Sequence, residues 1–313
     1  MVKVYFLDMQ KLGKEKTLAK LPELFDLAGF GSFIEKGDSV ALKIHFGEIG
    51  NTAYLKPLWV KPIIEKVKEK GGRPFLTDAN TLYQGTRNET ISHLKTASEH
   101  GYDLVSTGAP VIIADGLTGK DTAHVKIDLK HFKELKIALA IQQAQSLIAL
   151  THFKGHDMTG FGGALKNIGM GSGTKAGKLD MHSDCENCKA RTTCQKKQTI
   201  EACWVGSSDL VQEKMVEYAY GVIKERPYKV GFLTFILDVS PNCDCYSFND
   251  PPIVEDIGIL ASLDPIAIDQ ASVDLVGGDN FKKLYPNVDW AIQLKYGEKI
   301  GLGSRKYELI PAF

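Results

Sequence analysis

The chain has 313 residues, of which 43% are hydrophobic and 24% charged, as in an ordinary folded protein with ample material for a core. Its 38 Lys and Arg balance its 38 Asp and Glu, which argues against a general binder of nucleic acids or membrane surfaces. The longest apolar run, 137–150, contains Gln and Ser and is too short to span a bilayer, and the first residues lack a secretory signal pattern. We therefore expect a cytoplasmic protein whose clustered cysteines bind metal rather than form disulfides.

Strand-like and helix-like segments alternate along the chain. Strands are predicted where β-branched and aromatic residues cluster, at 2–7, 39–47, 73–78, 109–114, 146–151 and 229–239. Helices are predicted where apolar residues recur every three or four positions or where a cap precedes proline, at 17–27, 57–70, 88–100, 132–144, 208–224 and 265–276. Short connections between such elements are typical of βαβ units. We predict an α/β fold, with a mostly parallel or mixed sheet flanked by helices.

The domain organisation follows from the absence of repeats and linkers. We expect residues 1–313 to form a single α/β domain, which could divide into two lobes of about 1–150 and 151–313. A Cys-rich stretch over residues 180–205 interrupts this pattern. It is predicted to be a short metal-binding insertion.

Polar side chains follow three of the predicted strands. In order of the strands, these side chains are Lys43, His45 and Glu48, then Asp78 and Asn80, then His152, Lys154 and His156. Because ligands in open α/β sheets bind beyond the carboxyl ends of the strands, we expect these groups to surround one pocket. The candidate catalytic residues are His45, His152, His156, Lys154 and Asp78.

A glycine-rich run follows the third of these strands. Glycine has no Cβ, so backbone N–H groups can approach a ligand closely, although such a run can also be a plain turn. The residues predicted to bind an anionic small molecule are Gly162, Gly163, Lys166 and Asn167 of this run, with Lys43, Glu48 and Asn80. A divalent metal held by the three imidazoles could activate water, whereas without a metal the same groups suit proton transfer.

Six cysteines form the second constellation. Cys185, Cys188, Cys194 and Cys203 follow His182, and together these residues could hold zinc or an iron–sulfur cluster. Their spacing differs from the bacterial ferredoxin run, so zinc and a cluster both stay open. Cys243 and Cys245 end the strand at 229–239, where they could join a metal site or pack as small hydrophobic residues.

Several runs resemble one family in combination. They are 43–51, 77–83, 152–156, 162–169, the Cys243-Asp-Cys245 triplet and 256–269. Together they resemble the uncharacterised iron–sulfur-centre protein family, domain of unknown function 362, over nearly the whole chain. Members of that family often carry a ferredoxin-type insertion with two four-iron clusters. Here the shorter segment from Cys185 to Cys203 takes its place, so the resemblance implies at most one such centre and establishes no reaction.

Three functions are consistent with these patterns. The first is a redox protein whose iron–sulfur centre exchanges electrons with an anionic small molecule in the His/Lys/Gly-lined pocket, and with a redox partner protein. The second is a non-redox metal-dependent hydrolase or proton-transfer enzyme, with structural zinc on the cysteines. The third is a binding or scaffold protein without chemistry.

Overall fold

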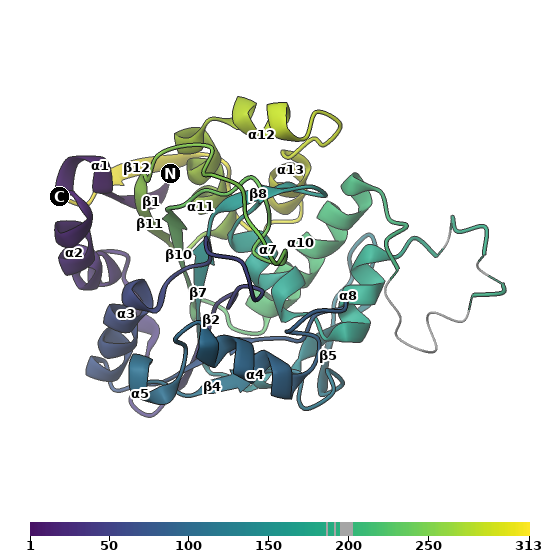
Figure 1. Cartoon of the computed structure of the whole chain (residues 1–313), viewed down its shortest axis with the longest axis horizontal. Helices are drawn as coiled ribbons and strands as arrows, with labels where there is room; N and C mark the ends of the chain where they lie inside the picture. The colour runs from purple at the N-terminus through teal and green to yellow at the C-terminus, as the bar shows by residue number, and fades with distance from the viewer. Residues whose placement is uncertain (186, 191, 195–202) are drawn as a thin grey trace.

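The computed structural model describes residues 1–185, 187–190, 192–194 and 203–313 (Figure 1). Its centre is an eight-stranded sheet. From edge to edge the strands are β12 (Tyr307–Pro311), β1 (Val2–Asp8), β11 (Gly258–Ser262), β10 (Val230–Ile236), β7 (Ser146–His152), β2 (Ser39–Lys43), β3 (Arg73–Asp78) and β4 (Val111–Ile113). Neighbours run parallel, except that β11 is antiparallel to both β1 and β10. The predicted α/β fold with a mixed sheet is confirmed.

Two apolar cores cover the two faces of this sheet. Successive strand residues point to opposite faces, so Val40 and Leu42 of β2 enter one core and Ala41 enters the other. The first core packs against α2 (Lys14–Leu27) and α3 (Pro57–Glu69). The second packs against α7 (Ala164–Ile168), α10 (Ser208–Lys224), α11 (Pro265–Val276) and α13 (Ile292–Lys299) (Figure 1). Each large apolar side chain buried in this way contributes about 1.5–3 kcal/mol, which fixes the strand ends in place.

Local capping explains where several helices begin. Asp264 accepts hydrogen bonds from the backbone of Ile266 and Ala267 and precedes Pro265, so it is the N-cap predicted for α11. Ser207 caps α10 by accepting from Leu210 N. The remaining elements are α1 (Met9–Leu12), the 3-10 helix η1 (Phe30–Phe33), α4 (Thr90–Glu99), α5 (Leu104–Thr107), β5 (Thr122–Lys126), β6 (Glu134–Ala138), α6 (Leu139–Gln143), β8 (Lys154–His156), β9 (Gly160–Gly162), the 3-10 helix η2 (Met170–Ser172), α8 (Lys175–His182) and α12 (Gly278–Leu284).

One predicted helix is wrong. Residues 132–144 form strand β6 followed by the short helix α6, and β6 pairs antiparallel with β5. The physical reason lies in alternation with a period of two, because Leu135 and Ile137 are buried while Lys136 between them is partly exposed. The β5–β6 hairpin thereby places apolar side chains against α10.

The parallel strands bring distant polar segments to one edge of the sheet. The carboxyl ends of β2, β3, β7 and β10 all point the same way, so the residues that follow Lys43, Asp78, His152 and Ile236 lie along one rim. No helix in the described ranges has the length and apolar character needed to cross a bilayer.

Candidate functional site

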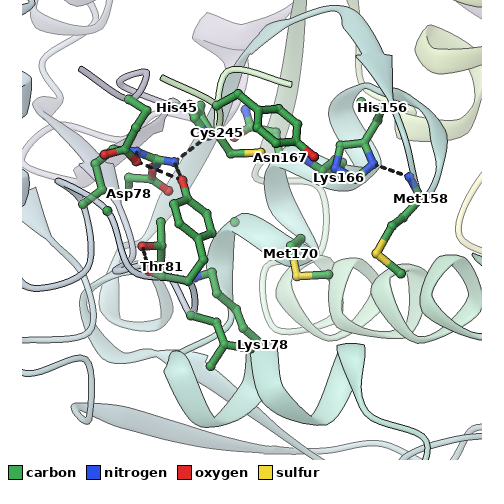
Figure 2. A pocket seen from close by; sticks show the side chains of 18 of the residues that line it. His45, Asp78, Thr81, His156, Met158, Lys166, Asn167, Met170, Lys178 and Cys245 are labelled. Atoms are coloured by element: carbon green, nitrogen blue, oxygen red, sulfur yellow. Dashed lines mark hydrogen bonds and ion pairs between the residues drawn. The ribbon is translucent and has the colours of Figure 1, made fainter. Parts of the chain in front are cut away.

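A cavity of about 720 Å³ lies beyond the carboxyl ends of β2, β3 and β7, a size common for small-molecule sites (Figure 2). Among its lining residues are twelve of the predicted site residues: Lys43, His45, Glu48, Asp78, Lys154, His156, Gly162, Gly163, Lys166, Asn167, His182 and Cys245. His152, Asn80 and Cys243 do not line it. The side chain of Asn80 is held behind the wall, where its Nδ2 donates to Asp115 Oδ1 at 2.9 Å.

Asp78 is a buried anion held by two cations. Its Oδ1 lies 2.9 Å from Lys43 Nζ and its Oδ2 lies 2.9 Å from Arg87 Nη1. Burial alone would raise the pKa of the Asp78 carboxyl, but the charges on Lys43 and Arg87 hold this pKa below its ordinary value. Both oxygens of Asp78 are thus paired with cations, so Asp78 is placed to act as a counter-ion rather than as a free base.

Arg87 also organises His45 and Glu48. The Nη2 of Arg87 donates to His45 Nε2 at 2.9 Å, and burial together with the Arg87 charge holds the pKa of His45 well below its ordinary value. Glu48 accepts from the backbone and hydroxyl of Thr86 and, at 3.0 Å, from the hydroxyl of Tyr83. His45 is therefore a neutral ring, and this wall is a closed hydrogen-bonded network.

Asp244 anchors a second buried network. Its carboxylate lies 2.9 Å from His152 Nδ1 and 2.9 Å from Lys154 Nζ. The other ring nitrogen of His152, Nε2, lies 2.9 Å from Leu237 O. Both ring nitrogens of His152 thus lie at hydrogen-bond distance from protein oxygens, so neither is directed toward a metal or a substrate in the cavity. In this structure His152 positions Asp244, which lies between Cys243 and Cys245.

His156, Cys243 and Cys245 form a potential metal-binding group. One potential ligand atom of each residue lies within 4.8 Å of those of the other two. Among the described residues, no other group of three or more His, Cys, Asp or Glu side chains is as closely spaced. Cys243 and His156 are buried, whereas Cys245 is partly exposed and lines the cavity. The backbone N–H of Met158 donates to His156 Nδ1 at 3.1 Å, and Asp157 Oδ1 lies 3.3 Å from the same nitrogen.

Lys166 sits beside this group on α7. Its Nζ donates to Cys243 Sγ at 3.1 Å. Burial alone would raise the pKa of the Cys243 thiol, but the hydrogen bond from Cys245 and the charge on Lys166 lower it well below its ordinary value. Conversely, the hydrogen bond to Cys243 and burial raise the pKa of Cys245. The lowered pKa of Cys243 favours its thiolate, the form that binds metal.

Positive charge predominates in the cavity wall. The cationic side chains that line it are Lys43, Arg87, Lys154, Lys166 and Lys178, of which all but the half-buried Lys166 are buried. The carboxylates that line it are Glu48, Asp78 and the exposed Asp157. Buried ammonium and guanidinium groups need compensating charge, so this wall favours an anionic ligand.

The Cys-rich segment leaves and rejoins the body at the cavity. His182 and Trp204 both line the cavity, with ring centroids 4.3 Å apart, and Gly206 N donates to His182 O at 2.9 Å. Cys185, Cys188, Cys194 and Cys203 are free and partly exposed, and residues 195–202 of the predicted insertion lie outside the described ranges. In the part of the chain that is described, no three of these four sulfurs lie within 4.8 Å of one another. The four-cysteine centre stays a prediction.

Among the residues of the site that were not sequence candidates are Asp244, Arg87 and Lys178. Asp244 had a signal, because it lies between two cysteines after a buried strand. Arg87 lies nine residues after Asp78, at which strand β3 ends, and the fold of the connecting loop returns its guanidinium group to the Asp78 carboxylate. Lys178 lies on α8, where its position in the sequence is indistinguishable from that of a lysine on a helix surface.

Comparisons with known proteins match the chain to one protein family and to solved structures of low sequence identity. No curated protein matches the sequence. Lactate racemase apoprotein from Thermoanaerobacterium thermosaccharolyticum is 18% identical with a TM-score of 0.46, over 76% of this chain and 51% of that one. A Thermotoga maritima protein from a structural genomics consortium is 12% identical with a TM-score of 0.49, over 94% of this chain and 61% of that one. The chain thus spans about half to three fifths of the length of these proteins.

The match that identifies the chain is to a family model. That model covers residues 40–274, which include every cavity-lining segment from β2 to the Cys243-Asp-Cys245 triplet. The family name carries no iron–sulfur assignment. The chain belongs to the family described as Domain of unknown function (DUF362).

Proposed function

We propose that this protein is a metal-dependent enzyme that acts on an anionic small molecule. His156, Cys243 and Cys245 would hold a transition-metal ion at the wall of the cavity. The observation that carries the proposal is the approach of their three ligand atoms to within 4.8 Å beside a cavity with a cationic lining. Two thiolates and one imidazole form a ligand set used by catalytic zinc sites that keep a fourth position open. A metal there would supply Lewis acidity toward a bound oxygen atom.

The surroundings of the ligands support this assignment. A histidine that binds metal through Nε2 carries its proton on Nδ1 and donates it to an outer acceptor; Asp157 Oδ1, 3.3 Å from His156 Nδ1, would be that acceptor in place of the contact that Met158 N–H makes in the metal-free structure. Lys166 supports the thiolate form of Cys243 through its hydrogen bond to the sulfur. Asp244, fixed by His152 and Lys154, holds the backbone that carries both cysteines. The donor set is soft, which favours zinc, copper or iron over magnesium or calcium.

The cavity supplies the means to orient the substrate. Lys154 and Lys166 both lie near Gly162, where an added Cβ would be 3.5 Å from Lys154 Cε and 3.2 Å from Lys166 Cδ. Both lysines line the cavity. An anionic group bound by them would lie close to His156 and Cys245, at the open side of the metal group.

Metal binding by the purified protein tests the proposal. The protein is stripped with a chelator, titrated with Co²⁺ without oxygen, and monitored for thiolate-to-metal charge-transfer absorption. We expect one equivalent to bind, and the absorption to be lost in Cys243→Ser and in Cys245→Ser. Cys185→Ser and Cys188→Ser are the matched controls and should leave it unchanged. The proposal is wrong if Cys243→Ser and Cys245→Ser bind Co²⁺ with the wild-type spectrum.

A second candidate function is electron transfer through an iron–sulfur centre on Cys185, Cys188, Cys194 and Cys203. The observation in its favour is that both ends of the Cys-rich segment meet at the cavity, through His182 and Trp204. Such a centre would exchange electrons between the cavity ligand and a partner protein. Protein purified without oxygen should then contain iron and acid-labile sulfide, and both should disappear in Cys185→Ser. A preparation that contains zinc and no sulfide would exclude this second function.

A further inference from the structure

Building on the cavity of the proposed function, we infer that its ligand is an amphipathic organic acid. The carboxylate or phosphate of this ligand binds at Lys178, and its apolar body lies along a methionine-rich wall that leads from Lys178 toward His156 and Cys245. The two ends of the cavity would thus differ in role: one end binds the anionic group of the ligand, and the other holds the metal-binding group.

Lys178 is the cation whose environment calls for an anion. It lines the cavity with only 7% of its surface exposed, and its Nζ donates to Gly173 O at 2.6 Å. Within the described ranges no carboxylate lies within the 4.0 Å of Nζ that defines an ion pair. Burial lowers the pKa of Lys178 to about 8, with partial opposition from Asp115 and Asp78. An anion bound at Nζ would restore the stability of the ammonium form.

The other charges near this end of the cavity are already paired. Lys43 and Arg87 share the carboxylate of Asp78, and Lys43 also donates to Asn167 Oδ1 at 2.9 Å. Glu48 Oε2 also lies 3.5 Å from Arg87 Nε, so these two cations are matched by two carboxylates, and Lys178 takes part in none of these pairs. Asp115 forms no ion pair with Lys178 within the described ranges: its Oδ1 accepts from Asn80 N and Nδ2, and its other oxygen is buried without a partner among those residues.

His182 supplies an independent sign of a missing ligand. Its ring lines the cavity with 8% of its surface exposed, and its Nδ1 is buried without a hydrogen-bond partner among the described residues. A buried polar atom without a partner is unfavourable, so such atoms usually face a ligand or water. His182 ends α8, one turn of helix after Lys178, and the two side chains therefore present polar groups to the same region.

The wall between the two ends is apolar. Figure 2 shows Met170 between Lys178 and His156, with Met158 beside His156. Further apolar residues that line the cavity include Leu82, Val211, Met215 and Trp204. Flexible thioether side chains adapt to an apolar or aromatic body of variable shape. A small inorganic anion would leave most of this wall without contacts, which is why the inference requires an organic body.

The test compares four probes on metal-free protein by isothermal titration calorimetry. The probes are 2-naphthoate, 2-naphthyl phosphate, uncharged 2-naphthamide and inorganic phosphate. We expect naphthoate or naphthyl phosphate to bind about tenfold or more tightly than naphthamide, as a charge-assisted hydrogen bond implies. Naphthyl phosphate should also bind at least tenfold more tightly than inorganic phosphate. The tighter of the two naphthyl anions identifies the head group.

Two variants of α8 locate the anion. Lys178→Met should weaken the naphthyl anions about tenfold or more while leaving naphthamide unchanged, and Lys178→Arg should recover most of the loss. Lys175→Met removes the same charge from the same helix outside the cavity lining and should bind every probe as the wild type does. If Lys178→Met fails to fold, Met170→Gln tests the apolar wall by weakening naphthyl phosphate but not inorganic phosphate.

Three results would overturn the inference. They are equal binding of naphthamide and the naphthyl anions, equal binding of inorganic and naphthyl phosphate, and equal effects of Lys178→Met and Lys175→Met. The outcome is independent of the metal, because Cys245→Ser should retain the preference for naphthyl anions. A protein that binds Co²⁺ but shows no such preference refutes this inference alone, and the reverse pattern refutes the metal assignment alone.

Discussion

Replacing Asp78 by Asn should destabilise the fold much more than removal of a surface carboxylate would. Asp78 is 2% exposed and neutralises both Lys43 and Arg87 at 2.9 Å. Removing one partner of a buried ion pair leaves uncompensated charge and costs about 3–5 kcal/mol. We expect urea unfolding at pH 7 to show this loss in Asp78→Asn. Asp128→Asn, at an exposed pair with Lys133, should change stability by less than about 0.5 kcal/mol.

A double-mutant cycle and a pH series sharpen this test. Lys43→Met combined with Asp78→Asn should cost less than the sum of the single changes, with a coupling energy of about 0.5–3 kcal/mol. The folded pKa of Asp78 lies below its unfolded value of about 3.9. Its contribution is thus present above about pH 4 and is lost as the pH falls further, so the variant should lose less stability than the wild type over that range. Additive single changes, or a variant as stable as the wild type, would refute the counter-ion role.

Three further predictions concern the neighbours of the site. Lys166→Met should weaken Zn²⁺ binding at pH 7 by about 10–100-fold, because Cys243 loses the ammonium group that stabilises its thiolate. Competition with a chelator measures the affinity for Zn²⁺. An effect no larger than that of Lys282→Met, at an exposed position, would contradict the prediction. Gly155→Ala should lower the free energy of unfolding in urea by about 1–3 kcal/mol, because the added Cβ would lie 2.2 Å from Pro241 O. Unchanged stability would contradict this and would show that the 241–245 segment can move to accommodate the methyl group. Burial raises the pKa of Asp269 to about 7, against hydrogen bonds from Leu165 N and Ala164 N, so wild-type stability contains a component that falls as the pH rises from about 4 to about 7. Asp269→Asn should lack this component, and identical pH slopes of unfolding would contradict the assignment.

The α/β class of the sheet could be predicted from the sequence because its central strands are continuous apolar runs, whereas β11, β12 and the strand order were not predicted. Ser146–His152 and Val230–Ile236 are buried along their whole length, and such runs are typical of central parallel strands. The helix predicted for residues 132–144 was wrong because the apolar positions of this short segment fit a helix and a strand about equally well. Pairing with β5 decided the outcome, and pairing between segments is not encoded in local periodicity.

The candidate site was predictable where a polar residue directly follows a strand. Lys43 and Asp78 end strands β2 and β3 and line the cavity, because strand direction alone determines where they lie. The role of His152 was not predictable in this way. Its ring is turned toward Asp244, a residue 92 positions later in the chain, and only the packing of the 237–245 segment determines that contact. The pairing of His156 with Cys243 and Cys245, rather than with other histidines, depends on the same segment.

A crystal structure of the protein soaked with zinc, with anomalous scattering recorded on both sides of the zinc absorption edge, tests the central claim most directly. The account predicts one strong peak bonded to His156 Nε2 at about 2.0–2.1 Å and to the sulfurs of Cys243 and Cys245 at about 2.3 Å, with its fourth position toward the cavity. A fully occupied zinc elsewhere in the molecule, with these three side chains left uncoordinated, would contradict it.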